Sequence, residues 1–316
     1  MQTPAIFNAL RTSQRILIAG AGGGFDVYAG LPLALSLMRE GKQVYLANLS
    51  FSELHLLDLD AWWDENVAEV TPAVTGLNDY FPERALAVWL ATNDLPSTVY
   101  AFPKVGVQPL RSAYQMFVTR LGVDAIVLVD GGTDILLRGD ESGLGTPVED
   151  MTSLAAVAGL DAVPVRLVAC LGFGIDAYHG VNHVQVLENI AELDGAGAYL
   201  GAFSIPSRSP EADLYRSAVA HAQAVTPLRP SIVNGQISAA LGAEHGDVRF
   251  TRRTQGSQLF VNPLMAMYFT FDLPGLAQHN LYLDRIDNTL GMQQVATRIE
   301  QFREEITPRI PRAFPH

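Results

Sequence analysis

Short apolar runs that stop abruptly at a turn residue recur along the chain. The first occupies residues 16–19 and stops at Gly20, as a strand buried on both faces of a sheet would stop. Runs of the same kind follow at residues 43–49, 124–130 and 163–172. We predict a strand in each of these places, and a further strand at residues 230–236.

Helical spacing of apolar residues alternates with these runs. Residues 31–40 are predicted to form a helix, because Pro32 is tolerated in a first helical turn and Gly41 follows as a stop. A strand, a helix and a strand within residues 15–49 make a βαβ unit, which requires parallel strands joined by a right-handed crossover. Further helices are predicted from residue 147, and at residues 182–193, 210–224 and 292–306.

This alternation predicts an α/β fold with a doubly wound, mostly parallel sheet, three-layered and Rossmann-like, with helices on both faces. We expect residues 1–316 to form a single α/β domain. Residues 50–97 interrupt the alternation and are predicted to be a helical insertion or cap beside the sheet. At the helix near residue 147, Thr146 is predicted to cap and Glu149 to close a capping box.

The composition favours a globular protein with a large core. Of the 316 residues, 48% are hydrophobic and 17% are charged, so we do not expect global disorder. The net charge of -12 argues against nucleic acid or a membrane surface as a partner, because phosphate binding needs a basic face. The single cysteine, Cys170, excludes an intrachain disulfide. Without a signal-peptide pattern or a membrane-length apolar run, the sequence predicts a cytoplasmic protein.

The predicted strands end in glycine and acidic residues. Because ligands of doubly wound sheets bind outside the carboxyl ends of the strands, we expect one ligand site there. The predicted ligand-binding residues are Gly20, Gly22, Gly23, Gly24, Asp26, Gly131, Gly132, Thr133, Asn234 and Arg253. Arg253 belongs to a basic doublet with Arg252, which is either ordinary surface or a loop that closes over a phosphate.

The glycine-rich loop after the first strand is not a dinucleotide fingerprint. A G-x-G-x-x-G motif from Gly20 would require glycine where Phe25 stands, and Asn48 replaces the expected acid of the second strand. No NAD, FAD or haem is therefore implied. Bare backbone N–H groups near a helix start form a nest for anions, which favours a phosphate. The alternative is that these glycines only make a tight turn.

Acidic residues in the later loops are candidate ligands of Mg²⁺ or Mn²⁺, which prefer hard oxygen donors. Asp130, Asp134 and Asp176 are the predicted metal ligands, and Asp130 and Asp134 are also predicted to be catalytic. Asp140 and Glu141 are either further ligands or ordinary turn residues. Glu149 and Asp150 are interpreted as first-turn acids favoured by the helix dipole, outside the site.

Two histidines follow the fourth strand. His179 lies beside Asp176 and is the predicted general acid or base. His183 stands four residues later, a spacing that would place both on one helix face. The pair would then suit a metal, although a capping or packed histidine is the commoner arrangement.

Three stretches together resemble an uncharacterised prokaryotic family, number eleven-fifty-two of the domain-of-unknown-function series. They are AGAGGGFDVYAGLPL (residues 19–33), VDGGTDILLRGDESGLGTPVEDM (129–151) and NPLMAMYFTFDLPGLAQHNLYL (262–283). The similarity runs from about residue 13 to residue 306. The resemblance implies one α/β unit with these loops as its signature, and it implies no activity, substrate or catalytic residue.

Three functions are compatible with such a site. We favour a metal-dependent enzyme that binds a phosphorylated small molecule or nucleotide and hydrolyses it or transfers its phosphoryl group. A second possibility is N-glycosidic hydrolysis, as in a nucleoside hydrolase, with the acids holding ribose hydroxyls. The third is a non-catalytic nucleotide or metabolite sensor, in a homo-oligomer that uses the apolar residues 259–273 as its interface.

Overall fold

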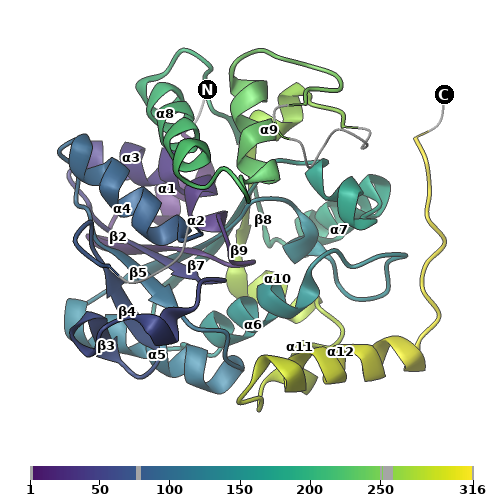
Figure 1. Cartoon of the computed structure of the whole chain (residues 1–316). Coiled ribbons are helices and arrows are strands. Elements are labelled where there is room, and N and C mark those ends of the chain that lie inside the picture. The colour runs from purple at the N-terminus through teal and green to yellow at the C-terminus, as the bar shows by residue number, and fades with distance from the viewer. Residues whose placement is uncertain (1–2, 76–79, 250, 252–258, 315–316) are drawn as a thin grey trace.

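The structure is a computed structural model that describes residues 3–75, 80–249, 251 and 259–314 (Figure 1). These residues contain nine strands: β1 Arg15–Gly20, β2 Gln43–Leu49, β3 Trp62–Asp64, β4 Val67–Val70, β5 Val99–Phe102, β6 Ala125–Asp130, β7 Val165–Leu171, β8 Tyr199–Ser204 and β9 Met267–Asp272. All nine belong to one sheet, in the order β3-β4-β5-β2-β1-β6-β7-β9-β8.

Helices cover both faces of this sheet (Figure 1). One face packs against α1 Ala5–Ala9, α2 Asp26–Ala29, α3 Leu31–Arg39, α4 Pro82–Thr92, α8 Pro210–Val225 and α9 Ile232–Leu241. The other packs against α5 Val107–Leu121, α6 Pro147–Ala158, α7 His183–Gly195, α10 Leu273–His279, α11 Leu283–Ile286 and α12 Met292–Glu305. Short 3-10 helices lie between them: η1 Leu54–Leu56, η2 Leu59–Ala61, η3 Asp134–Leu136, η4 Ile175–His179 and η6 Pro263–Ala266.

The sheet is mixed, so the predicted doubly wound, mostly parallel Rossmann-like sheet is wrong. Only β5, β2, β1, β6 and β7 run parallel to one another, in the middle of the sheet. On one side, β4 pairs antiparallel with β5, and β3 with β4. On the other side, β9 runs antiparallel to both β7 and β8. The βαβ pattern predicted the parallel strands in the middle of the sheet. It contained no information about the antiparallel pairs at the edges.

Residues 50–97 supply part of this antiparallel edge. They were expected to be helical, but besides η1, η2 and α4 they contain the hairpin of β3 and β4, which extends the sheet beyond β5. Trp63 packs face to face on Tyr100 of β5, with 5.0 Å between the ring centroids. These strands are three and four residues long, too short for a clear alternation of apolar and polar positions.

Two local predictions near the site also fail. Residues 230–236 were predicted to be a strand, but they form the start of α9, where the Ser231 side chain accepts a hydrogen bond from the Asn234 amide. The apolar pair Ile232 and Val233 suggested a strand, but a helix begins there because the serine caps it. At the start of α6, Thr146 makes no capping bond to the helix, because its side chain binds Asp134 instead.

The central strands determine where a site can form. β1 lies between β2 and β6, and the chain order along the sheet reverses at the β1–β6 boundary. Both strands point their carboxyl ends to the same edge, because they are parallel. Loops that follow β1 and β6 therefore meet at this edge, which is where ligands bind in open α/β sheets. Among the described residues, no helix combines the length and the apolar character needed to cross a membrane.

Candidate functional site

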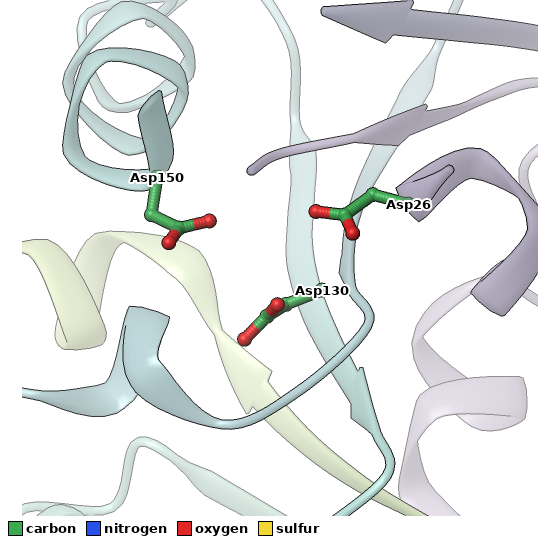
Figure 2. Close-up of side chains that lie close together, drawn as sticks. All are labelled: Asp26, Asp130 and Asp150. Atoms are coloured by element: carbon green, nitrogen blue, oxygen red, sulfur yellow. The ribbon is translucent and has the colours of Figure 1, made fainter. Parts of the chain in front are cut away.

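Three aspartates converge beyond the carboxyl ends of β1 and β6 (Figure 2). Asp26 opens α2 directly after the glycine-rich loop, Asp130 is the last residue of β6, and Asp150 lies in the first turns of α6. One carboxylate oxygen of each lies within 4.8 Å of the others. Asp130 and Asp150 are buried, with 3% and 1% of their surface exposed. We call these three residues the acidic cluster.

The glycines of the adjoining loops allow the backbone to approach this cluster closely. The Gly22 amide donates a hydrogen bond of 2.7 Å to the Asp26 carboxylate. A side-chain carbon at Gly22 would lie 2.7 Å from an oxygen of both Asp26 and Asp150, and one at Gly131 would lie 3.0 Å from Asp26. Real side chains do not fit at such distances, so glycine is required at Gly22 by the carboxylates themselves.

Asn48, at the end of β2, holds the glycine-rich loop in place. Its amide nitrogen donates to the Gly24 carbonyl at 2.8 Å, and its amide oxygen accepts from the Val27 backbone at 3.3 Å. The same oxygen occupies the space where Gly20 would carry a side chain. Asn48, which departs from the dinucleotide pattern, therefore has a structural role, because it supports the glycine-rich loop.

The other two predicted metal ligands lie around the cluster and bind backbone amides. Asp134 accepts hydrogen bonds from the Thr146 amide at 2.7 Å and the Thr146 hydroxyl at 2.9 Å. Asp176 accepts a bond of 2.6 Å from the Thr133 amide and packs against Gly132, where a side-chain carbon would be 2.6 Å away. Only Asp130 of the predicted metal set thus belongs to the acidic cluster, while Asp134 and Asp176 fix the loops beside it.

Together these five aspartates concentrate negative charge in a buried place. Burial raises the pKa of Asp26 to about 8, and the charges of Asp134 and Glu149 add to this shift. Burial also raises the pKa of Asp134, and it raises those of Asp130, Asp150 and Asp176 well above their usual range. No ion pair within the described part of the chain includes any of the five. Buried carboxyl groups without ion pairs are stable only when they are protonated or when a cation binds them.

Asp150 is the residue that the sequence interpretation wrongly left outside. It was interpreted as an acid favoured by the helix dipole, but its side chain is buried against the Gly22 loop. One of its oxygens, Oδ1, is buried and has no hydrogen-bond partner among the described residues. A signal for this role was available: α6 follows β6, so its first turns must lie at the carboxyl edge of the parallel strands.

The two histidines do not form a pair on one helix. His179 ends η4 and is exposed, and a positive charge there opposes the rise of the Asp134 pKa. His183 begins α7 and packs on Phe173, with 5.8 Å between the ring centroids. His179 therefore affects Asp134, which adjoins the acidic cluster, whereas His183 packs on an aromatic ring.

The remaining predicted residues lie apart from the cluster. Asn234 supports the glycine-rich loop, since its side chain donates to the Phe25 carbonyl at 3.1 Å and accepts from the Tyr215 hydroxyl at 2.8 Å. Arg253 lies outside the described residues. Asp140 and Glu141 both pair with Arg309 near the C-terminus, and neither belongs to the acidic cluster.

One basic residue near the loop was missed by the sequence analysis. The Lys104 ammonium lies 4.0 Å from the centroid of the Phe51 ring, and Phe51 covers Gly23 of the glycine-rich loop. Lys104 also lies 3.9 Å from a carboxylate oxygen of Glu149 in α6. No local motif surrounds Lys104 in the sequence, so its position beside the glycine-rich loop is visible only in the folded structure.

Comparison with protein families gave one match. A family model described as a protein of unknown function (DUF1152) matches residues 62–305. This range includes Asp130, Asp150 and the loops between them, and it begins after the glycine-rich loop. Neither the curated proteins nor the solved structures compared with the chain gave a match. Because the family model covers well over half of the sequence, the chain belongs to the DUF1152 family of uncharacterised proteins.

Proposed function

We propose that the protein is a divalent-metal-dependent enzyme that acts on a phosphorylated small molecule or nucleotide, by hydrolysis or phosphoryl transfer, in the cytoplasm. The observation that carries this proposal is the acidic cluster, in which Asp26, Asp130 and Asp150 bring carboxylate oxygens within 4.8 Å of one another. Oxygen ligands on opposite sides of Mg²⁺ lie about 4 Å apart, so this spacing is close to that of a metal site.

The protonation of the cluster supports a cation as its natural partner. Carboxyl groups that burial drives toward the neutral form regain their charge when a divalent ion compensates it. The Oδ1 atom of Asp150 adds an independent argument, because a buried oxygen without a hydrogen-bond partner is expensive to maintain unless it binds something. Mg²⁺ or Mn²⁺ fits three carboxylates better than a softer metal does.

The surroundings of the cluster suit a phosphate. Gly23 and Gly24 both have left-handed backbone conformations, with φ of +87° and +60°, which is typical of backbone that curves around a ligand. Lys104, above Phe51, supplies a positive charge beside this loop. A divalent ion held by Asp26, Asp130 and Asp150 would offset the phosphate charge and lower the pKa of a water beside it. His179 would serve as the acid or base.

Metal binding is the first test. We expect Mn²⁺ or Mg²⁺ at about 100 times its dissociation constant to raise the free energy of unfolding by roughly 2.7 kcal/mol. Asp150→Asn should weaken metal binding at least about tenfold in calorimetric titration, because one ligand is lost. Asp161→Asn is the matched control, since the Asp161 side chain is 96% exposed and lies outside the cluster. Equal metal affinity in both variants would contradict the proposal.

Turnover is the second test. Release of inorganic phosphate from sugar phosphates and nucleotides should require the metal and should be lost in Asp130→Asn. Release of a free base from nucleosides would instead indicate N-glycosidic hydrolysis. Tight metal-dependent binding of a phosphorylated ligand without turnover would indicate a non-catalytic sensor. It would refute the catalytic part of the proposal.

A further inference from the structure

A cavity of about 540 Å³ lies beside η4, the short helix whose Asp176 binds the loop after β6. Its walls come from the loop after β7, from α7 and α9, and from the segment before β9. Ile175 of η4 lines the cavity, while the next residue, Asp176, turns to the Thr133 amide beside the cluster. The cavity has the size of a small-molecule site, and η4 connects it to the loop that follows Asp130.

Aromatic side chains surround the cavity. Phe173 lines it from the β7 loop, with Tyr178, Phe260 and Phe314 around it. The last three are exposed, with 48%, 74% and 54% of their surface open to solvent. Large exposed aromatic rings that gather at one cavity are typical of a binding site, because their faces are covered only when a flat group enters.

Two residues that line the cavity each carry a buried polar atom without a hydrogen-bond partner among the described residues. Gln236 of α9 is 1% exposed, and its Nε2 amide has no hydrogen-bond acceptor among the described residues. The Nδ1 atom of His183 is likewise buried without a partner. Burial lowers the pKa of His183, so the imidazole is neutral at pH 7. A neutral imidazole and a primary amide together offer both donors and acceptors to a ligand.

These features define the chemistry of a group that fits the cavity. It is flat, because aromatic rings flank it, and its edge carries hydrogen-bond donors and acceptors that match an amide and an imidazole. A purely apolar ring would leave Gln236 unsatisfied. A nitrogen heterocycle such as a nucleobase meets both requirements.

We infer that this cavity binds the heteroaromatic ring of the ligand whose phosphate lies at the acidic cluster. The inference rests on the proposed function and narrows its substrate class to nucleotides or similar phosphorylated heteroaromatic compounds. Gln236 and His183 bind the edge of the ring, and Tyr178 covers its face. These residues determine specificity, whereas the acidic cluster determines the reaction.

The test compares ligands that share a phosphate but differ in the ring. Calorimetric titrations with Mn²⁺ use the nucleoside 5′-monophosphates of the common bases, and ribose 5-phosphate as the ligand without a ring. We expect the best nucleotide to bind at least about tenfold more tightly than ribose 5-phosphate. Gln236→Leu should reduce nucleotide affinity to the level of ribose 5-phosphate, while Mn²⁺ and ribose 5-phosphate bind as before. Gln43→Leu, at an exposed position of β2, is the matched control.

A second variant guards against misfolding of the first. Tyr178→Ala removes an exposed ring and should weaken nucleotide binding without changing the affinity for Mn²⁺. If ribose 5-phosphate binds as tightly as every nucleotide, the inference is overturned while the proposed function stands. If no phosphate compound shows Mn²⁺-dependent binding, the proposed function fails. Free nucleosides then test whether the cavity binds a heteroaromatic ring. Nucleoside binding that Gln236→Leu abolishes would support such binding, and the absence of nucleoside binding would overturn it.

Discussion

At the scale of single residues, Glu83 anchors Asn48, the residue that holds the glycine-rich loop in place. Glu83 lies in the first turn of α4 with none of its surface exposed, and it accepts a hydrogen bond of 2.7 Å from the Asn48 amide. Burial raises its pKa to about 7, although the bond from Asn48 opposes this shift. The group therefore exchanges its proton near neutral pH while it anchors the residue that holds the glycine-rich loop.

This shift predicts a pH dependence of stability. As the pH rises from about 4.5 to about 7, the unfolded chain loses the Glu83 proton before the folded chain does, so the free energy of unfolding falls. The expected loss is about 3 kcal/mol. Glu83→Gln should abolish this part of the pH dependence in urea titrations across the range. Glu244→Gln, at an exposed position, should leave it unchanged. Parallel pH curves for the wild type and Glu83→Gln would contradict the assignment.

The glycine-rich loop shows what sequence can predict about single residues. The requirement for bare backbone was predictable from four glycines after a buried strand, and a ligand was the natural explanation. The structure adds that Gly22 is closely approached by carboxylates of the chain itself. Asp150, more than one hundred residues away, is one of them, and no local pattern around residue 22 contains that information.

At the scale of elements, the segment after α12 is held mainly by the contacts of Arg309. Residues 307–314 lie along α7 and the loop after η3, and Arg309 is the centre of their contacts. Its guanidinium lies 2.8 Å from oxygens of both Asp140 and Glu141, and Glu141 is fully buried. It also donates to the Asn189 side chain at 2.8 Å. One arginine thus compensates a buried charge that has no other ion pair among the described residues.

Removal of Arg309 should therefore destabilise the fold. Arg309→Ala leaves the Glu141 carboxylate buried with only neutral hydrogen-bond donors, and we expect a loss of about 3 kcal/mol in the free energy of unfolding. Arg312→Ala is the matched control, because the Arg312 side chain is 70% exposed and, within the described ranges, pairs with Glu188 alone. Urea denaturation of both variants measures the difference. A loss in Arg312→Ala as large as that in Arg309→Ala would refute the argument.

Elements with a strong pattern were predictable from the sequence, and short or context-dependent ones were not. Residues 43–49 were predicted as a strand and form β2 with the same bounds, and the helix predicted at 210–224 is α8. The hairpin of β3 and β4 is too short to show a period, and α9 depends on a serine cap more than on its apolar residues. Tertiary packing decides such segments, because local propensity is weak there.

At the scale of the whole molecule, the order and direction of the edge strands lay beyond sequence reasoning. β9 inserts between β7 and β8 although about sixty residues separate it from β8 along the chain. Nothing in the apolar tract 259–273 distinguishes a parallel strand from an antiparallel one, because both are buried runs of similar residues. The edge of the sheet at which the acidic cluster lies was predictable, since it depends on the shared direction of β1 and β6 and on the segments that follow them.

The acidic cluster draws its members from distant parts of the chain, and this makes it a potential reporter of assembly. A break between Asp94 and Leu95, in the exposed connection between α4 and β5, would leave Asp26 on one fragment and Asp130 and Asp150 on the other. Neither fragment alone would contain the three carboxylates. Complementation of the two halves would restore the acidic cluster. If the proposed function holds, Mn²⁺ bound there would signal by its paramagnetism that β1 and β6 had come together.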